Sequence, residues 1–179
     1  MHKSAYINAQ KFFHKYCSQD ITSKIVLDIG SWDGGNGNLR SIFQNAKYIG
    51  LDIQHGPNVD MVANSHNIPL KDNSIDIIVS SSCFEHDPMF WITFLEMSRI
   101  IKPDGYIYIC APSSGPYHPE KCPGDSWRFY PDSWLSLAQW SNKNNFSIHL
   151  IDSYIDTVHY APDEDWRDSI GIFTKKCCI

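Results

Sequence analysis

A run of apolar residues that ends in an aspartate and opens into a glycine-rich loop constrains this chain most. The stretch VLDIGSWDGGNG spans residues 26–37 and places Asp28 and Gly30 at the end of a short apolar strand. Glycine lets the backbone approach a ligand closely and adopt positive φ. A second apolar strand, KYIGLD, ends in Asp52, roughly 20 residues after Gly30. An acid at this distance can accept both hydroxyls of an adenosine ribose, so the pattern predicts an adenosine-containing cofactor.

Apolar segments with strand and helix periodicity alternate along the chain. This alternation predicts a single α/β domain over residues 1–179, with a mostly parallel sheet covered by helices on both faces. Ligands of such sheets bind beyond the carboxyl ends of the strands. The N-cap of the last helix is expected at Asp132, directly after Pro131. The strands are expected at 24–29, 47–52, 59–63, 74–82, 106–112, 146–155 and 169–175, and the helices at 4–18, after the glycine loop around 39–43, at 88–101 and at 133–141.

Composition excludes several classes of function. The formal net charge is −5 at pH 7, and Lys and Arg are scattered, which disfavours a nucleic-acid partner. No apolar stretch reaches the roughly 18 residues that a membrane span needs. The first residues lack the apolar region of a signal peptide, so we expect a cytoplasmic protein. The six cysteines show no CxxC spacing and are interpreted as reduced thiols.

The glycine loop itself discriminates between cofactors. It lacks the G-x-G-x-x-G spacing that brings a helix N-terminus onto a pyrophosphate, because Trp32 stands in the position of the second glycine. Asp28 and Asp33 would repel a pyrophosphate and attract a sulfonium or an amino group. The sequence therefore favours S-adenosylmethionine over NAD. An NAD(P)-dependent oxidoreductase remains a minor alternative, without an obvious Tyr-x-x-x-Lys pair.

Residues beyond the second strand carry a family resemblance. NIPLKDNSIDIIVSSSCFEHD, followed by EMSRIIKPDGYIYICAP, resembles the class I S-adenosylmethionine-dependent methyltransferases over roughly residues 25–112. The resemblance implies a Rossmann-like three-layer sandwich whose seven-stranded sheet has an antiparallel last strand. GSWDGGNGNLR, FEHDPMFW and WRFYPD further resemble a subgroup found beside glycan-biosynthesis genes. In that subgroup a tryptophan in the loop is normal.

The resemblance also implies roles for individual residues. Trp32 would be either a wall of the site or a plug in the core. Ser81 and Ser82 would face the transferred methyl group. The implied cofactor contacts are Asp28, Gly30 and Ser31 for the methionine part, Asp52 for the ribose, Ile53 for the adenine ring, and Asn64 and Ser65 for the adenine amino group.

The acceptor side is interpreted from two loops. An alcohol acceptor needs a base or a metal ion to take up its proton. The candidates for the base are His86, His118 and Asp125, although the Glu85–His86 pair could equally be structural. Residues 113–130 place aromatic rings beside an acid and an arginine, which suits a sugar or nucleotide-sugar, unless this loop is only a lid. The expected substrate contacts are Tyr117, Trp127, Arg128 and Tyr130.

A metal bound by His86, His118 and Asp or Glu residues is a minor alternative, and no metal ligand set is assigned because no spacing in the sequence supports one. His159 and Tyr160 could close the acceptor side, and residues 163–165 are expected to be a solvated acidic turn. With no room for a separate substrate domain, the acceptor pocket is expected to come from the 113–130 loop, the N-terminal helix or the partner subunit of a homodimer.

The sequence thus predicts methyl transfer from S-adenosylmethionine to a hydroxyl of a sugar, nucleotide-sugar or glycan. A small-molecule N- or carboxyl-methyltransferase and a non-catalytic scaffold domain are the alternatives. The scaffold would bind the cofactor weakly or not at all.

Overall fold

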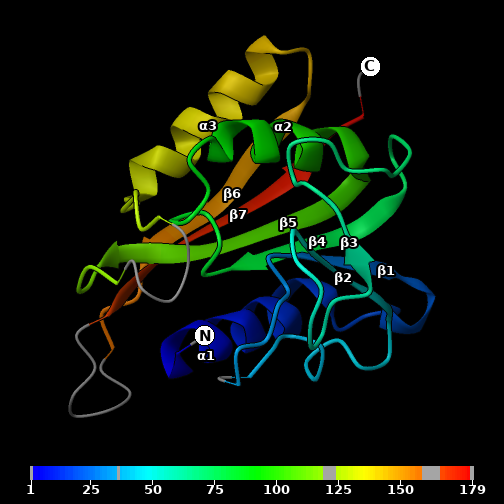
Figure 1. Ribbon diagram of the computed structural model, residues 1–179. Helices are drawn as coiled ribbons and strands as arrows, with labels where there is room; N and C mark the ends of the chain where they lie inside the picture. The colour runs from blue at the N-terminus through cyan, green and yellow to red at the C-terminus, as the bar shows by residue number, and fades with distance from the viewer. Residues whose placement is uncertain (1, 36, 119–123, 159–165, 178–179) are drawn as a thin grey trace.

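The computed structural model describes residues 2–35, 37–118, 124–158 and 166–177, and its strands form one sheet in the order β3-β2-β1-β4-β5-β7-β6 (Figure 1). The first five strands pair in parallel, whereas β7 runs antiparallel to both β5 and β6. This arrangement confirms the predicted Rossmann-like sheet. The strands are β1 (Ile25–Ile29), β2 (Lys47–Asp52), β3 (Met61–Val62), β4 (Ile75–Ser81), β5 (Ile101–Ser114), β6 (Ile148–Ile155) and β7 (Arg167–Lys175).

Helices cover the sheet on both faces, as Figure 1 shows. On one face lies α1 (Lys3–Phe12), which continues into a π-helical turn, η1 (Phe13–Cys17). Helices α2 (Phe90–Ile100) and α3 (Pro131–Lys143) cover the other face. A short 3₁₀ turn, η2 (Ile21–Ser23), leads into β1.

Each face has its own apolar core. In α1 the buried residues Ala5, Ala9 and Phe12 recur at helical spacing and pack on the sheet. On the other face, Phe94 of α2 and Trp134 of α3 are fully buried. The apolar side chains of β1 point alternately into the two cores, so this strand is buried on both of its faces.

The helix expected around residues 39–43 is wrong. This segment forms successive turns in which the N–H of Ile42 bonds the carbonyl of Leu39 at 3.0 Å and that of Ala46 bonds Phe43 at 2.9 Å. The apolar spacing that predicted a helix reflects burial instead, because Leu39 and Phe43 both insert into the core beside α1. The described residues between the glycine loop and β2 therefore contain no regular helix.

Several element boundaries also differ from expectation, and those of β5 and α3 differ for clear physical reasons. Strand β5 begins at Ile101 rather than at residue 106, and residues 102–105 lie within it as an irregularity, with Asp104 at a φ of 58°. Helix α3 begins at Pro131 with Tyr130 as its N-cap, and Asp132 lies in its first turn. Proline suits the first helical position because its fixed φ is already helical and no N–H is needed there.

Four of the six cysteines belong to the described residues, and these four are free thiols. Cys122 and Cys178 lie outside the described residues.

Within the described part of the chain, no helix is both long enough and apolar enough to cross a membrane.

The order of the strands fixes where a ligand can bind. Strands β1 and β4 are neighbours, and the chain proceeds from β1 toward one edge of the sheet and from β4 toward the other. This reversal leaves a crevice at their carboxyl ends. The loop after β1 and the loop after β4 both open at this point.

Candidate functional site

The loop after β1 is held against the end of β2 by backbone hydrogen bonds. The N–H groups of Gly30 and Ser31 both donate to the carbonyl of Leu51, at 2.9 and 3.0 Å. Gly30 has a φ of 81°, and a Cβ at this position would lie 2.6 Å from the Cβ and Sγ atoms of Cys83. A glycine is therefore required here both for the backbone conformation and for the close approach of the loop after β4.

Asp52, at the end of β2, stabilises the same loop by hydrogen bonds. One carboxylate oxygen accepts the N–H of Trp32 at 3.1 Å, and the other accepts the N–H of Gln54 at 3.1 Å. A carboxylate can accept further hydrogen bonds, so these contacts leave capacity for ribose hydroxyls. The next residue, Ile53, is 73% exposed.

Asp28 is an acid buried at the base of the crevice. It is only 4% exposed, and one carboxyl oxygen accepts a short hydrogen bond from the hydroxyl of Tyr48. Burial raises the pKa of Asp28 to about 7, although the Tyr48 hydroxyl and the Arg40 guanidinium oppose this rise. Asp28 therefore keeps its proton to a higher pH than an exposed aspartate does.

Trp32 forms a wall of the crevice. Its side chain is 39% exposed and lies directly against Gly34 and Gly56, so the alternative that Trp32 plugs the core is wrong. These glycines provide the space that the indole ring occupies.

The residues expected beside the adenine belong to a hydrogen-bond network. The side-chain oxygen of Asn64 accepts the N–H of His66 at 2.9 Å. The hydroxyl of Thr93 donates to the carboxylate of Asp87 at 2.5 Å and lies 2.9 Å from the hydroxyl of Ser65. Asp87 further pairs with the ring of His66 and accepts the N–H of Met89 ahead of α2. Asn64 and Ser65 thus help to orient the loop after β4.

That loop carries a buried acid beside a histidine. Glu85 is 2% exposed, and its Oε1 lies 3.8 Å from Nε2 of His86. Burial raises the pKa of Glu85 to about 8 and lowers that of His86, in each case by disfavouring the charged form. Nδ1 of His86 makes a short contact with the carbonyl of Gly124. A carbonyl only accepts, so Nδ1 carries the hydrogen and Nε2 keeps the lone pair.

The segment after β5 brings a second histidine to the same place. Nδ1 of His118 lies 3.0 Å from Oδ2 of Asp125 and 3.2 Å from the carbonyl of Pro116. Arg128 donates to both oxygens of Asp125, at 2.6 and 2.9 Å, and its hydrogen bonds hold the pKa of this carboxyl well below the usual range. Asp125 is thus an ionised anchor for His118, and Arg128 is occupied by Asp125.

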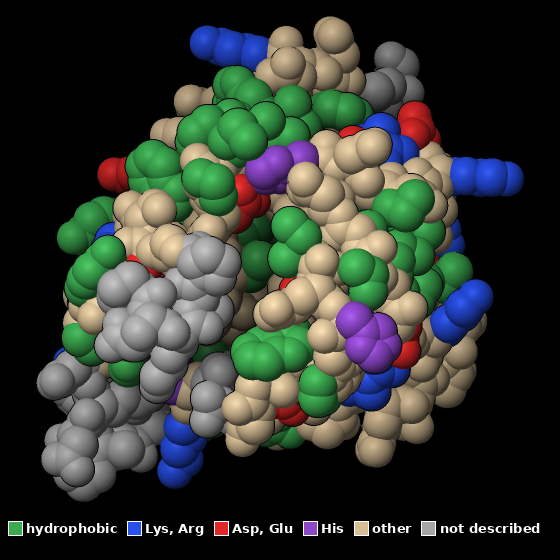
Figure 2. All heavy atoms as spheres, in the orientation of Figure 1, with side chains coloured by type: hydrophobic (Ala, Val, Ile, Leu, Met, Phe, Trp, Pro, Cys, Tyr) green, Lys and Arg blue, Asp and Glu red, His purple; other side chains and the backbone are tan. Residues whose placement is uncertain are grey.

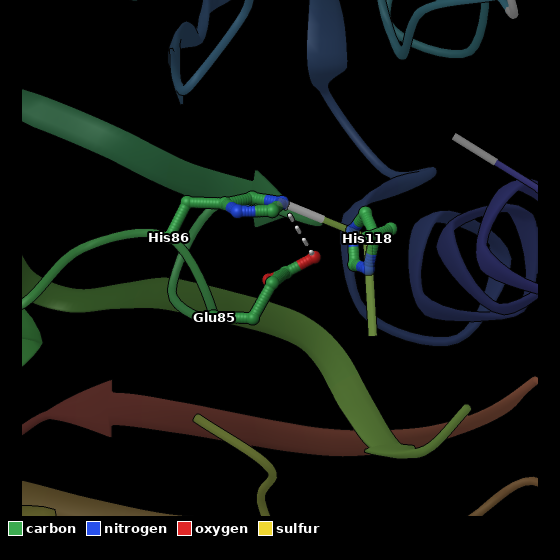
Figure 3. Close-up of side chains that lie close together, drawn as sticks. All are labelled: Glu85, His86 and His118. Carbon is green, nitrogen blue, oxygen red and sulfur yellow. Dashed lines mark ion pairs between the residues drawn. The ribbon is translucent and has the colours of Figure 1, made fainter. Parts of the chain in front are cut away.

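Figure 3 shows Glu85, His86 and His118 converging from the loop after β4 and the segment after β5. The rings of His86 and His118 meet edge to face, with their centroids 5.0 Å apart. The ligand atoms of all three side chains lie within 4.8 Å of one another.

A cavity of about 670 Å³ lies between the glycine loop and this cluster. Its volume is in the range of small-molecule sites, and Figure 2 shows one face of the molecule hollowed near its centre. The described residues that line the cavity include Asp28, Asp33 and Glu85 but no Lys or Arg. Ser31 Oγ, Ser81 Oγ and Glu85 Oε2, all on lining residues, are buried without a hydrogen-bond partner in the described part of the chain. The cavity therefore suits a polar ligand, and a positively charged ligand would favour the ionised forms of its buried acids.

This lining fits S-adenosylmethionine better than a dinucleotide. The sulfonium and the amino group are cationic, whereas a pyrophosphate would meet carboxylates. The turns after the glycine loop, where a helix was expected, also provide no helix N-terminus for a phosphate.

The cavity contains some of the predicted site residues but not all of them. Predicted residues that line it are Asp28, Gly30, Ser31, Trp32, Ser81, Ser82, His86 and His118. Predicted residues that do not line it are Asp52, Ile53, Asn64, Ser65, Asp125, Tyr117, Trp127, Arg128 and Tyr130.

The expected substrate aromatics have other surroundings. Tyr117 and Tyr130 are 72% and 58% exposed. Trp127 packs edge to face on Phe90 and donates its indole N–H to the carbonyl of Asp87 at 3.1 Å. His159, Tyr160 and residues 163–165 lie outside the described residues.

Sequence reasoning missed several residues of the cavity wall, among them His2 and Trp166. Trp166 stacks on His2, with ring centroids 5.0 Å apart, and meets His118 edge to face at 4.9 Å. His2 is fixed by Asp168, whose carboxylate lies 3.1 Å from Nε2. Both line the cavity, and neither belongs to a motif that could have indicated it.

Residues 27–109 match the family model described as a methyltransferase domain. These residues run from β1 through most of β5 and include the glycine loop, Asp52 and the Glu85–His86 pair. Over this stretch, which is just under half of its length, the chain is similar to methyltransferase domains. The methyl donor of the family is S-adenosylmethionine.

Curated relatives of the methyltransferase domain agree with this family. A protein of Mycobacteroides abscessus described as an uncharacterized methyltransferase is 33% identical over 102 residues, which cover 48% of this chain and 38% of that protein. A fatty-acid O-methyltransferase of Mycolicibacterium smegmatis is 26% identical over 111 residues, covering 54% of this chain and 40% of that one. The chain thus matches only about two fifths of the length of these relatives. Their names give no support to the glycan-biosynthesis subgroup.

Solved structures share the fold over nearly the whole chain. The YcgJ protein of Bacillus subtilis has a TM-score of 0.68 at 14% identity, covering 96% of this chain and all of that one. The 1,6-didemethyltoxoflavin-N1-methyltransferase of Burkholderia thailandensis, solved with S-adenosylhomocysteine, has a TM-score of 0.66 at 14% identity, covering 97% and 85%. At this identity the likeness concerns the fold of the methyltransferase domain alone.

Proposed function

We propose that this chain transfers a methyl group from S-adenosylmethionine to a hydroxyl of a small polar acceptor. The observation that carries the proposal is the cavity itself, which joins the glycine loop of the methyltransferase domain to the histidines after β4 and β5. The end of the cavity at the glycine loop suits a cationic cofactor, and the end at the histidines holds a neutral imidazole. These two ends are the parts that O-methyl transfer requires.

The cofactor end is supported by charge and by unsatisfied polar groups. Asp28 and Asp33 favour the amino group and the sulfonium, and the orphaned hydroxyls of Ser31 and Ser81 offer hydrogen bonds to the methionine part. Asp52 would receive the ribose hydroxyls with its remaining lone pairs. Bound at this place, S-adenosylmethionine supplies an activated methyl group.

The acceptor end supplies the base. Nε2 of His86 has its lone pair available, and burial lowers the pKa of His86, so the ring is neutral at neutral pH. In the transfer, the acceptor hydroxyl gives its proton to this nitrogen, and the oxygen forms a bond to the methyl carbon. The carbon–sulfur electron pair returns to sulfur, which becomes a neutral thioether. General-base assistance of this kind contributes about 10²–10⁴ in rate.

More specifically, we propose that the acceptor is a carbohydrate. Its support lies in the indole rings of Trp32 and Trp166, which offer apolar faces in the cavity wall to the C–H groups of a sugar. A nucleotide-sugar has less support, because Asp125 already holds the guanidinium of Arg128 that would pair with its phosphate. The wall thus favours an unphosphorylated sugar or glycan hydroxyl.

An acceptor with a nitrogen or carboxylate nucleophile is the second candidate. This second candidate is supported by the names of two similar proteins, a fatty-acid O-methyltransferase and an N1-methyltransferase. Such nucleophiles need no strong base. Replacing His86 by Gln would then leave kcat nearly unchanged, whereas an alcohol acceptor would lose about 10² or more in kcat.

Binding of S-adenosylmethionine tests the proposed function first. We expect micromolar binding in a calorimetric titration, for the cofactor and for its demethylated product. The Asp52→Asn variant should bind about 10- to 100-fold more weakly, because a hydrogen bond to a charged group contributes about 1.5–3 kcal/mol.

Asp104→Asn is the matched control, since this acid is 76% exposed and lies at the opposite end of the strands. Its affinity should equal that of the wild type. If the wild-type protein binds neither compound, the domain is a scaffold and the proposal fails.

A further inference from the structure

We propose that Glu85, His86 and His118 bind a divalent transition-metal ion, best represented by Zn²⁺, in the wall of the cavity. The site brings together two imidazole nitrogens and one carboxylate from segments on either side of β5. Three protein ligands of this kind, with a further position open to the cavity, form a usual catalytic zinc site.

The spacing of the three side chains is close to that of a metal site. Their ligand atoms lie within 4.8 Å of one another. Ligands at about 2.0–2.2 Å from a tetrahedral ion are roughly 3.4 Å apart. Small rotations of the side chains would close this difference, and Figure 3 shows that Glu85 and His86 already point toward each other.

The hydrogen bonds of the histidines orient the lone pairs that a metal needs. Nδ1 of His86 donates to the carbonyl of Gly124, and Nδ1 of His118 lies against the carboxylate of Asp125 and the carbonyl of Pro116. In both rings this leaves Nε2 as the ligand atom. Histidines that bind metals are fixed in this way by a carbonyl or carboxylate on the other nitrogen.

Glu85 carries a buried carboxyl group whose Oε2 atom accepts no hydrogen bond from the described residues. It is 2% exposed, and Oε2 has no hydrogen-bond partner in the described part of the chain. Burying such a group is costly unless it is paired or coordinates a metal. A bound cation would compensate this carboxylate.

The surrounding charges permit a cation. Among the described residues, Arg128 is a positive group that acts on Glu85 and His86, and both of its terminal nitrogens bind the ionised carboxylate of Asp125. The described cavity lining contains no Lys or Arg. Two nitrogen donors favour a transition metal over Mg²⁺ or Ca²⁺, which prefer oxygen ligands.

The ion would change how the acceptor hydroxyl is activated, and this consequence rests on the proposed function. A hydroxyl at the open position would become more acidic, so its proton could pass to solvent while its oxygen attacks the methyl carbon and the carbon–sulfur electrons return to sulfur. His86 would then be a ligand rather than the base. Binding of the ion does not itself require methyl transfer.

The test is a calorimetric titration of chelator-treated full-length protein with Zn²⁺, with Co²⁺ absorption in the visible region as a second readout. We expect one ion per chain with micromolar affinity or better and no comparable binding of Mg²⁺. The Glu85→Gln and His118→Gln variants should each lose about 100-fold in Zn²⁺ affinity or more. Asp125→Asn should lose about 10- to 100-fold, because it releases the ring of His118.

His149→Gln is the matched control, since His149 is an exposed histidine of β6 outside the cluster, and its affinity should not change. Circular dichroism establishes that each variant is folded. The metal proposal is overturned if the wild type binds no Zn²⁺, or if Glu85→Gln and His118→Gln bind it as tightly as the wild type. Titration with S-adenosylmethionine separates the two proposals, because loss of the metal site leaves cofactor binding in place.

Discussion

The Asp28→Asn variant is expected to exceed the wild type by about 3–4 kcal/mol in free energy of unfolding at pH 8. Burial raises the pKa of Asp28 to about 7 in the folded protein, whereas an unfolded aspartate titrates near 3.8. Between these values the folded state keeps a proton that the unfolded state has lost. Stability of the wild type therefore falls as the pH rises through this window. The amide has no charge to bury and can still accept the Tyr48 hydroxyl.

Urea denaturation at pH 4 and pH 8 measures this effect. The two proteins should be close in stability at pH 4 and should diverge as the pH rises. Asp104→Asn provides the control, because its exposed carboxylate should produce no such divergence. If wild type and Asp28→Asn lose stability in parallel between the two pH values, Asp28 is not a buried titrating acid.

The same substitution should weaken cofactor binding. A cationic ligand at Asp28 favours the ionised carboxylate, so binding near neutral pH would release a proton, and affinity would fall by up to tenfold per unit of pH below 7. Calorimetry in buffers with different ionisation enthalpies detects this proton. The acid thus costs stability at the position where it would serve the cofactor.

Gly50→Ala is expected to lower the free energy of unfolding by about 3 kcal/mol or more. Gly50 lies in β2, where a Cβ would overlap the backbone carbonyl of Asn58 and lie 2.7 Å from Oγ of Ser31. A carbonyl of the main chain cannot rotate away as a side chain can. The added methyl group would therefore displace the segment of Asn58 from β2 and crowd Ser31 of the glycine loop, so cofactor binding should also weaken.

Thermal and urea denaturation of Gly50→Ala measure the loss. Gly34→Ala is the matched control within the same loop region, because its Cβ would meet only the partly exposed ring of Trp32, at 3.0 Å. Its cost should stay below about 1 kcal/mol. Equal stability of the two variants would mean that the loop is not packed against β2 as described.

The sheet could be predicted from sequence because its signals are local. Each buried strand is an apolar run, and the aspartates at the ends of β1 and β2 mark the carboxyl edge where parallel strands place their loops. The helix after the glycine loop could not be excluded in the same way. Leu39 and Phe43 have helical spacing, but burial of a series of turns produces the same pattern.

The acceptor side was predictable only in part. His86 follows a strand directly, so topology alone directs it to the crevice. For residues 113–130 composition indicated polar and aromatic side chains but not their partners. The pairing of Arg128 with Asp125 therefore had no signal in the sequence. Trp166 reaches the cavity through the antiparallel return of β7, a contact that no local pattern encodes.

The position of Trp166 also provides an intrinsic spectroscopic reporter. Its indole lies in the cavity wall against His2 and His118, whereas Trp134 is fully buried in the core under α3. Fluorescence emission from Trp166 should respond to a ligand that enters the cavity, and emission from Trp134 should respond to unfolding. With Trp166→Phe as the reference, fluorescence can follow occupancy of the cavity without a label and while the acceptor is still being sought.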